Sequence, residues 1–273
     1  MYIPLSYAAK CKRNTARGLP FFVDNLTDDF LILAVAFVPL TQAPLATFLG
    51  LLLLHLSLWA IYEVGYFEND LVAATIEPDG KVPPRFSEFR NRFSEPVSWG
   101  AAIFLGAAGI AVLVAGGMIP REPDAAGVAL AGAVWLAFLI ALRLTYRVYN
   151  RIDKASRVFL YLPLQMFKYG FGALFLPLAP AGAALIFSQI LRRWVPYIVY
   201  RNAGSLPTGL EPRILRLLTF CSIWLLLLPA AEPAGHLIIG ALGFALLLAR
   251  SNSRILTRWR RATSAAEDMG RAT

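Results

Sequence analysis

The chain has little charge and few of the residues that build common active sites. Charged residues make up 16% of its 273 residues, and there are only two cysteines and two histidines. Cys11 and Cys221 are far apart in the sequence and do not have the spacing of metal ligands. Neither His55 nor His236 belongs to a metal-binding motif, so we expect both to be packing residues.

The sequence also lacks the motifs of several large enzyme classes. It has no phosphate-binding loop, no glycine-rich nucleotide motif, no GxSxG and no HExxH. These absences argue against nucleotide hydrolases, serine hydrolases and zinc enzymes. The first 20 residues contain no apolar core of a signal peptide, so we expect no cleavable leader.

Long apolar stretches dominate what is present. Hydrophobic residues make up 58% of the chain, and eight stretches approach or reach the length that crosses a bilayer. They lie at about 28–42, 45–66, 98–119, 125–146, 158–178, 182–200, 214–230 and 233–250. The sequence therefore predicts an all-α, polytopic membrane helix bundle with about eight transmembrane helices.

The basic residues alternate between the connections of these stretches. The net charge is +9, and Lys and Arg gather in the two terminal segments and after the second, fourth and sixth stretches, whereas the other connections hold only Arg121. Such alternation predicts that both termini are cytoplasmic. We expect one membrane domain over 1–273 in a bacterial inner membrane. It has an N-terminal segment 1–27, a bundle 28–250 with a cytoplasmic loop 67–97, and a basic tail 251–273. The basic residues then face phospholipid headgroups rather than nucleic acid.

Acidic residues gather where the second apolar stretch ends, in the segment 62–85. Glu63, Asp70 and Glu77 recur every seven residues, so a continuing helix would hold them on one face. Carboxylates at the end of a membrane helix are costly, and each is a candidate functional residue. Gly65, on the same helix, would allow a close helix contact.

Structural roles for the same residues stay open. Glu63 could pair with one of the basic residues within later spans, since charges inside a membrane usually pair. These candidates are Lys168, Arg192 and Arg193. Glu68 and Glu77 could be solvated loop residues, and the tyrosines near the span ends could form an interfacial belt.

In this arrangement the chain resembles the UbiA-type intramembrane prenyltransferases. Their first signature reads Asn-Asp-x-x-Asp-x-x-x-Asp and precedes a Lys/Arg-Pro stretch. Here Asn69, Asp70 and Glu77 match in type, whereas Ala73 replaces the middle aspartate. The second aspartate signature, which follows the sixth helix in that family, is absent. The resemblance covers nearly the whole chain in topology and about 25 residues in motif, and it implies two four-helix halves around a cytoplasm-facing cavity.

The resemblance also implies the roles of individual residues. Asn69, Asp70 and Glu77 would hold a single Mg²⁺, and Asp70, Glu63 and Tyr66 would be the catalytic residues. Basic and tyrosine side chains would bind a (di)phosphate in place of the missing signature. These substrate-binding candidates are Lys81, Arg85, Tyr149, Lys154, Lys168, Arg192, Arg193, Tyr197 and Arg201.

These residues predict a UbiA-like membrane transferase that acts at the cytoplasmic face. Its substrate would be a polyprenyl or related lipid (di)phosphate, from which an alkyl or glycosyl group is transferred with the help of Mg²⁺. One alternative is a non-catalytic member that binds a lipid carrier or a partner protein, which the missing signature and Ala73 favour. Another is a small transporter that uses Glu63 and the basic residues within the spans. The expected partners of the protein are membrane lipids and an isoprenoid or lipid (di)phosphate.

Overall fold

The computed structural model describes residues 4–12, 19–77, 80–119, 125–204, 211–230 and 234–251. Helices account for 84% of these residues, and no strand occurs among them. Short π-helical turns stand near the N-terminus, at η1 (Ala8–Lys12) and η2 (Leu26–Phe30), with α1 (Leu19–Asn25) and α2 (Leu31–Phe37) on either side of η2. The chain is therefore all-α, as the sequence predicts.

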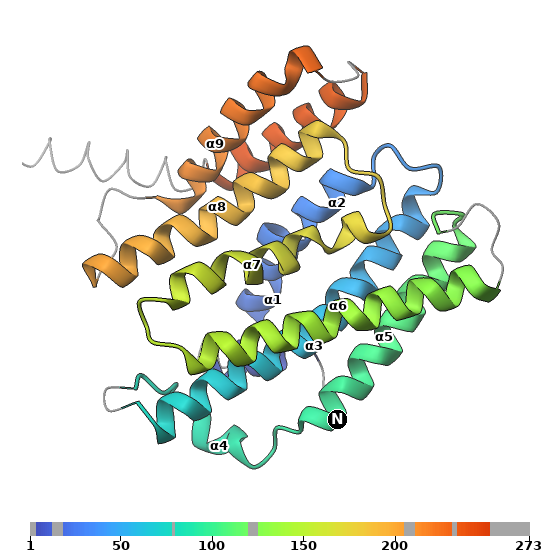
Figure 1. Ribbon diagram of the computed structural model, residues 1–273. Helices are drawn as coiled ribbons and strands as arrows, with labels where there is room; N and C mark the ends of the chain where they lie inside the picture. Colours follow the sequence, from blue (N-terminus) through green and yellow to red (C-terminus); the bar gives the residue numbers. More distant parts are fainter. Residues whose placement is uncertain are drawn as a thin grey trace, which may run out of the picture.

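Three long helices lie in the middle of the chain and cross the molecule together. They are α3 (Pro44–Thr75), α5 (Glu95–Ala115) and α6 (Ala125–Arg151), and the short α4 (Phe86–Arg90) precedes α5. The chain continues through α7 (Arg157–Gly170), η3 (Phe171–Leu174), α8 (Pro180–Ala203), α9 (Pro212–Leu227), η4 (Leu228–Ala230) and a last helix, Ala234–Ser251. Figure 1 shows α7 between α6 and α8.

Four of these helices are long and apolar enough to cross a membrane. They are α3, α5, α6 and the last helix. The other predicted spans fall on shorter pieces or on α8, which has 24 residues but carries Arg192, Arg193 and Arg201. The first predicted span, 28–42, does not form one helix, because α2 ends at Phe37 and α3 begins only at Pro44.

Proline and glycine set the helix ends. Proline stands in the first turn of α3, α5, α8 and α9, where its missing N–H leaves no hydrogen bond unmade. Gly204 ends α8 with φ +70°, a left-handed conformation that favours glycine. Pro163 and Pro196 lie inside α7 and α8, so neighbouring groups must satisfy the carbonyls that they leave free.

Small residues let α3 approach its neighbours. A Cβ at Gly50 would lie 3.2 Å from the carbonyl oxygen of Gly109 in α5, and a Cβ at Gly65 would overlap the ring of Tyr146 in α6. Close backbone approach through glycine is typical of packed membrane helices. The close contact that the sequence predicts at Gly65 is confirmed.

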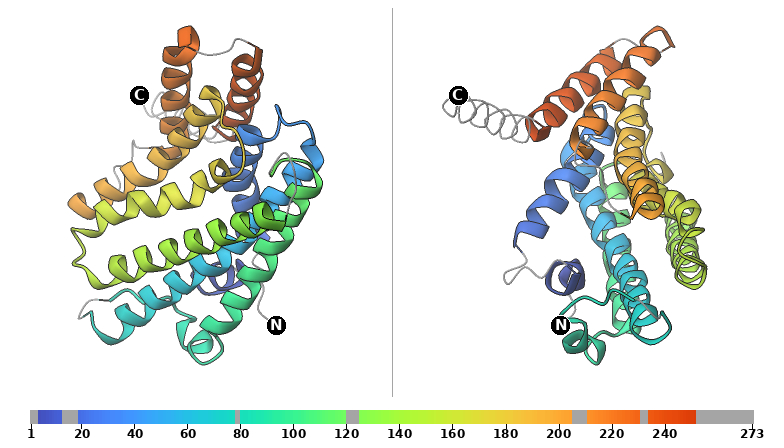
Figure 2. Two further views of the ribbon diagram at one scale, coloured as in Figure 1. Left: turned by 45° about the vertical axis from the view of Figure 1, so that its right-hand side comes forward. Right: turned by 90° about the vertical axis from the view of Figure 1, so that its left-hand side faces the viewer.

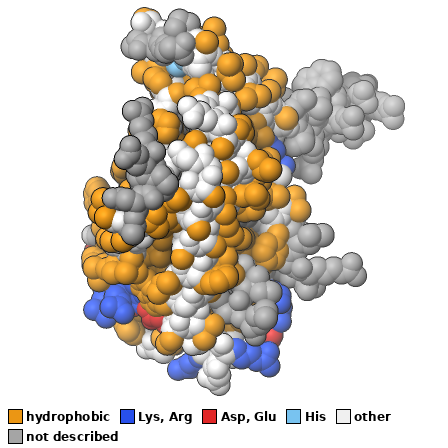
Figure 3. Space-filling model, turned by 90° about the vertical axis from the view of Figure 1, so that its right-hand side faces the viewer, with side chains coloured by type: hydrophobic (Ala, Val, Ile, Leu, Met, Phe, Trp, Pro, Cys, Tyr) orange, Lys and Arg blue, Asp and Glu red, His pale blue; other side chains and the backbone are white. Residues whose placement is uncertain are grey.

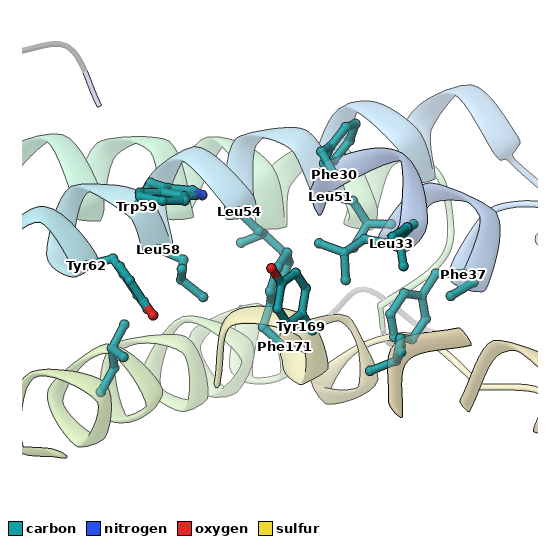
Figure 4. Close-up of a cluster of buried hydrophobic side chains, with 14 of the residues drawn as sticks. Phe30, Leu33, Phe37, Leu51, Leu54, Leu58, Trp59, Tyr62, Tyr169 and Phe171 are labelled. Carbon is teal, nitrogen blue, oxygen red and sulfur yellow. The ribbon is translucent and has the colours of Figure 1, made fainter. Parts of the chain in front are cut away.

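The hydrophobic core joins the first and second parts of the chain. Phe30 and Leu33 from η2 and α2, Leu54 and Leu58 from α3, and Phe171 from η3 interdigitate in one buried cluster (Figure 4). In addition, α2 packs more extensively on α8 than on α3. The N-terminal helices are therefore packed against the later part of the chain.

The outer surface is largely apolar. Phe104, Leu130, Phe159 and Leu226 are among the large hydrophobic side chains that lie exposed. Figure 3 shows apolar side chains over most of one face and basic side chains gathered at its lower end. An apolar surface of this extent is typical of a protein that meets lipid, and it agrees with the four membrane-length helices.

Candidate functional site

The acidic residues of α3 face the N-terminal segment rather than open space. Glu63 and Asp70 are buried, with exposed fractions of 0% and 2%. The backbone N–H of Ala8 donates to Oε1 of Glu63 at 2.7 Å, and the hydroxyl of Tyr7 donates to Oδ2 of Asp70 at 2.7 Å. Nζ of Lys12 lies 2.9 Å from Oδ1 of Asp70. Both carboxylates therefore hold one segment, 7–12, against α3.

Aromatic contacts strengthen this attachment. The ring of Tyr7 makes edge contacts with Phe67, Phe89 and Phe93, and Figure 2 shows η1 beside α4. Burial raises the pKa of Tyr7, and the neighbouring carboxylate of Asp70 raises it further. The hydroxyl consequently stays protonated and donates its hydrogen bond.

Glu77 does not share a helix face with Glu63 and Asp70, because α3 ends at Thr75. Its carboxylate lies 2.8 Å from Nη2 of Arg157 and 3.2 Å from Nζ of Lys154. Burial alone would raise the pKa of Glu77, but hydrogen bonds from these two basic groups lower it overall. The continuing helix that would place Glu77 on the face of Glu63 and Asp70 is not formed.

A turn between α6 and α7 positions the two basic groups. The backbone N–H groups of Ala155 and Ser156 both donate to Oδ1 of Asp153 at 2.9 Å, and α7 starts at the next residue, Arg157. The guanidinium of Arg157 is also held by the carbonyl of Asn150 at 3.2 Å. A short loop thus brings Lys154 and Arg157 back to the end of α3.

A cavity of about 500 Å³ opens at this end of the bundle. The helix ends that surround it are those on the left in Figure 1. It lies among the ends of α3, α6, α7 and α8. Its charged and amide-bearing lining residues are Lys12, Asn69, Glu77, Lys81, Lys154, Arg157 and Arg201. The remaining lining residues are Tyr66, Ala73, Tyr146, Tyr149, Tyr161, Leu164, Tyr200 and Gly204. Five basic side chains and one carboxylate therefore surround a space with a tyrosine wall.

Hydrogen bonds order part of that wall. The hydroxyls of Tyr149 and Tyr197 lie 2.8 Å apart, and Nε of Arg201 donates to the Tyr197 hydroxyl at 2.8 Å. Nζ of Lys12 lies 4.6 Å from the centre of the Tyr66 ring, within reach of a cation–π interaction. These contacts fix Lys12 and Arg201 at the cavity.

The structure brings together about half of the residues predicted from the sequence. Those that line the cavity are Tyr66, Asn69, Glu77, Lys81, Tyr149, Lys154 and Arg201, with Tyr197 directly behind. Glu63 and Asp70 are buried and do not line the cavity, and Asp70 is linked to it by its ion pair with Lys12. Arg85 does not line it. Its guanidinium pairs with Glu88 at 2.7 Å and donates to the carbonyl of Lys10 at 3.5 Å.

The remaining basic candidates belong to another cluster, which sequence reasoning missed. Lys168 and Arg193 pair with Asp29 at 2.6 and 2.8 Å, and Arg192 pairs with Asp28 at 3.3 Å. Both aspartates lie in η2 and are buried. The proposed partner Glu63 is therefore not the counter-charge of these residues. Two adjacent aspartates inside a predicted span were the signal that could have revealed this cluster.

Glu68 is also not the solvated loop residue that the sequence left open as an alternative. Its carboxylate pairs with the guanidinium of Arg143 and accepts a hydrogen bond from Nδ2 of Asn150 at 3.3 Å. Arg143 further pairs with Glu95 at 2.9 Å, so it links α3, α5 and α6. This pairing gives Glu68 a structural role.

The arrangement of the predicted magnesium ligands does not suit a cation held by protein groups alone. Asp70 is bonded to Tyr7 and Lys12, and Glu77 is bonded to Lys154 and Arg157. Across the described residues, no three His, Cys, Asp or Glu side chains stand close enough together to hold a metal ion. The cavity presents the chemistry of an anion site, because guanidinium and ammonium groups bind phosphate oxygens directly.

In comparisons with known proteins, no family model, no curated protein and no solved structure matches the chain.

Proposed function

We propose that the protein binds the (di)phosphate of a polyprenyl or related membrane lipid in the cavity at the ends of α3, α6, α7 and α8, and that it is a UbiA-like transferase acting on this lipid. One observation carries the proposal. Five basic side chains and a single carboxylate surround a space of about 500 Å³ at one end of an apolar helix bundle.

The lining fits a phosphate on one side and a hydrocarbon chain on the other. The basic lining residues can approach a phosphate from different directions. Lys154 lies in the α6–α7 turn, Arg157 begins α7, and Arg201 lies in α8. Tyr146, Tyr161 and Leu164 offer ring and aliphatic surface deeper in the cavity. The lipid would thus lie with its head at the charged end and its chain toward the apolar bundle.

Transfer would break the bond between the allylic carbon and the diphosphate oxygen. The electron pair leaves with the diphosphate, whose growing charge the basic groups neutralise, and an acceptor atom then bonds to the carbon and loses a proton. Tyrosine rings can shield a developing cation. Of the predicted catalytic residues, Tyr66 lines the cavity, whereas Asp70 acts as a positioning residue that holds Lys12.

Magnesium stays a prediction in this scheme. When bound, the ion would add charge neutralisation on the phosphate oxygens, and a diphosphate would supply most of its ligands. Asn69 and Glu77 are the oxygen-bearing residues at the cavity that could complete the set.

The topology belongs to the same proposal. We infer eight spans, with both termini and the cavity on the cytoplasmic side of a bacterial inner membrane. The support is that basic residues line the cavity, since cytoplasmic connections are enriched in Lys and Arg.

Incubation of purified protein with a radiolabelled allylic diphosphate and Mg²⁺ tests the proposal. We expect saturable binding and diphosphate release, and the double variant Lys154→Gln/Arg157→Gln should weaken binding at least tenfold. Arg85→Gln is the matched control, because Arg85 carries the same charge and lies outside the cavity. Equal binding by the double variant and the control would refute the assignment of the cavity.

A non-catalytic lipid-binding protein is the second candidate. Asp70 and Glu63, the two carboxylates expected to act in catalysis, are both occupied by the N-terminal segment. Tight binding of the diphosphate without its release, in the presence of Mg²⁺ and candidate acceptors, would favour this function over the transferase.

A further inference from the structure

A second group of basic side chains lies away from the cavity, and its six members share the carboxylates of three aspartates in their ion pairs. We call it the arginine cluster. It consists of Lys168, Arg192, Arg193, Arg213, Arg216 and Arg250. Their ion-pair partners are Asp24, Asp28 and Asp29. None of the six basic residues lines the cavity described above.

One carboxylate is shared by four guanidinium groups. Asp28 lies 2.8 Å from Arg250, 3.1 Å from Arg213, 3.3 Å from Arg192 and 3.6 Å from Arg216. A carboxylate has about four acceptor positions, whereas each guanidinium has about five N–H groups. Asp28 therefore cannot satisfy the donors that converge on it.

The unsatisfied donors are buried. Arg216 is fully buried, and its Nε has no hydrogen-bond acceptor among the described residues. Nε of Arg193 is buried and lacks an acceptor in the same way. A buried donor without a partner is costly, and a buried cation without a counter-charge is more so. Both observations call for a further anion with several acceptor oxygens.

The arginine cluster is also accessible from the protein surface. Arg193, Arg213 and Arg250 are 29%, 15% and 25% exposed in their side chains, whereas Arg216 is at 0%. The three residues come from α8, from the first turn of α9 and from the end of the last helix. An anion can therefore approach the partly exposed guanidiniums from the surface while Arg216 supports the site from within.

We propose that the arginine cluster is a second anion-binding site, separate from the cavity, which takes a phosphate group. Guanidinium groups bind phosphate oxygens in a bidentate fork, and a phosphate brings the several acceptors and the negative charge that Asp28 cannot supply. The group comes either from free phosphate or from the headgroup of an anionic phospholipid. The site does not depend on the proposed function of the cavity.

Thermal unfolding of the detergent-purified, delipidated protein tests this site. The double variant Lys154→Gln/Arg201→Gln is used as the background, because it removes phosphate binding in the cavity. One arm adds sodium phosphate against sodium chloride at equal ionic strength. The other adds mixed micelles of phosphatidylglycerol against phosphatidylcholine. We expect one arm to raise the Tm by about 5 °C at a hundredfold excess over Kd.

Further variants assign the shift to the cluster. Arg216→Gln should abolish it, and Arg250→Gln, at a partly exposed position, should raise the Kd at least tenfold. Arg85→Gln should leave it unchanged. A response to phosphate identifies free phosphate as the ligand, and a response to phosphatidylglycerol alone identifies a headgroup. No shift in either arm, or a shift that survives in Arg250→Gln, overturns the proposal.

Discussion

Gly65 in α3 has no room for a side chain, because the ring of Tyr146 lies against its backbone. Gly65→Ala would force the Cβ into that ring and push α6 away from α3. We expect the free energy of unfolding to fall by about 1–3 kcal/mol, the usual cost of overpacking. Thermal unfolding of the purified variant in detergent measures this change.

Gly132 in α6 provides the matched control. A Cβ at Gly132 meets nothing within 4 Å. Gly132→Ala should therefore leave stability unchanged or raise it by up to about 1 kcal/mol through helix propensity. Equal losses in both variants would show that the Tyr146 contact is not the cause.

The N-terminal segment 7–12 behaves as an element that is fastened to α3 by a few buried polar contacts. Tyr7→Phe removes the hydroxyl that donates to Asp70 and leaves a buried carboxylate with one partner fewer. We expect a cost of about 1–3 kcal/mol in holding the segment. Tryptic cleavage at Lys10 and Lys12 should accelerate about fivefold or more.

Thr75→Ala is a suitable control for that experiment. Thr75 is exposed at the end of α3, and its hydroxyl bonds to the carbonyl of Leu71 in the same helix. Cleavage at Lys10 and Lys12 should keep its original rate in this variant. If Tyr7→Phe also kept that rate, the bond to Asp70 would not be what holds the segment.

The sequence was informative about single helices and much less so about their partners. The predicted spans at 45–66, 98–119, 125–146 and 233–250 each fall on one of the four membrane-length helices, because long apolar runs are a local property. The predicted span 28–42 is helical only as far as Phe37, and its two aspartates pair with side chains more than 130 residues away. Periodicity carries no information on such distant pairs.

The same limit applied to the candidate site. Charge and position were enough to find Lys154 and Arg201, which line the cavity. They were not enough to place Arg192 and Arg193, because which carboxylate an arginine meets depends on how helices cross. Arg157, one of the basic residues after the fourth apolar stretch, and Tyr161 were not among the candidate site residues, yet both line the cavity.

On the scale of the whole molecule, the proposed topology places the two ends of α3 on opposite sides of the membrane. Exposed Ala155 follows α6 at the cavity end, whereas exposed Gln42 precedes α3 at the other end. In a background without Cys11 and Cys221, we expect Ala155→Cys to react with an impermeant thiol reagent only from the cytoplasmic side. Gln42→Cys should react only from the opposite side.

Intact spheroplasts and inverted vesicles allow the two sides to be compared. The cysteine-free parent reports background labelling, and detergent-solubilised protein reports full reactivity. Labelling of both positions from one side would contradict a topology in which α3, α5 and α6 each cross the membrane.

Asp28 connects the beginning of the chain with its end. Arg250, in the last turn of the final helix, bonds to a carboxylate that is synthesised more than 200 residues earlier. During synthesis, the first helices therefore emerge with two aspartates whose basic partners follow only with α7, α8, α9 and the last helix. The ion pairs of Asp28 are complete only when the last helix has been made. A chain that ends before the last helix would therefore keep Asp28 without its pair to Arg250, and losing a partner of a buried charge is costly.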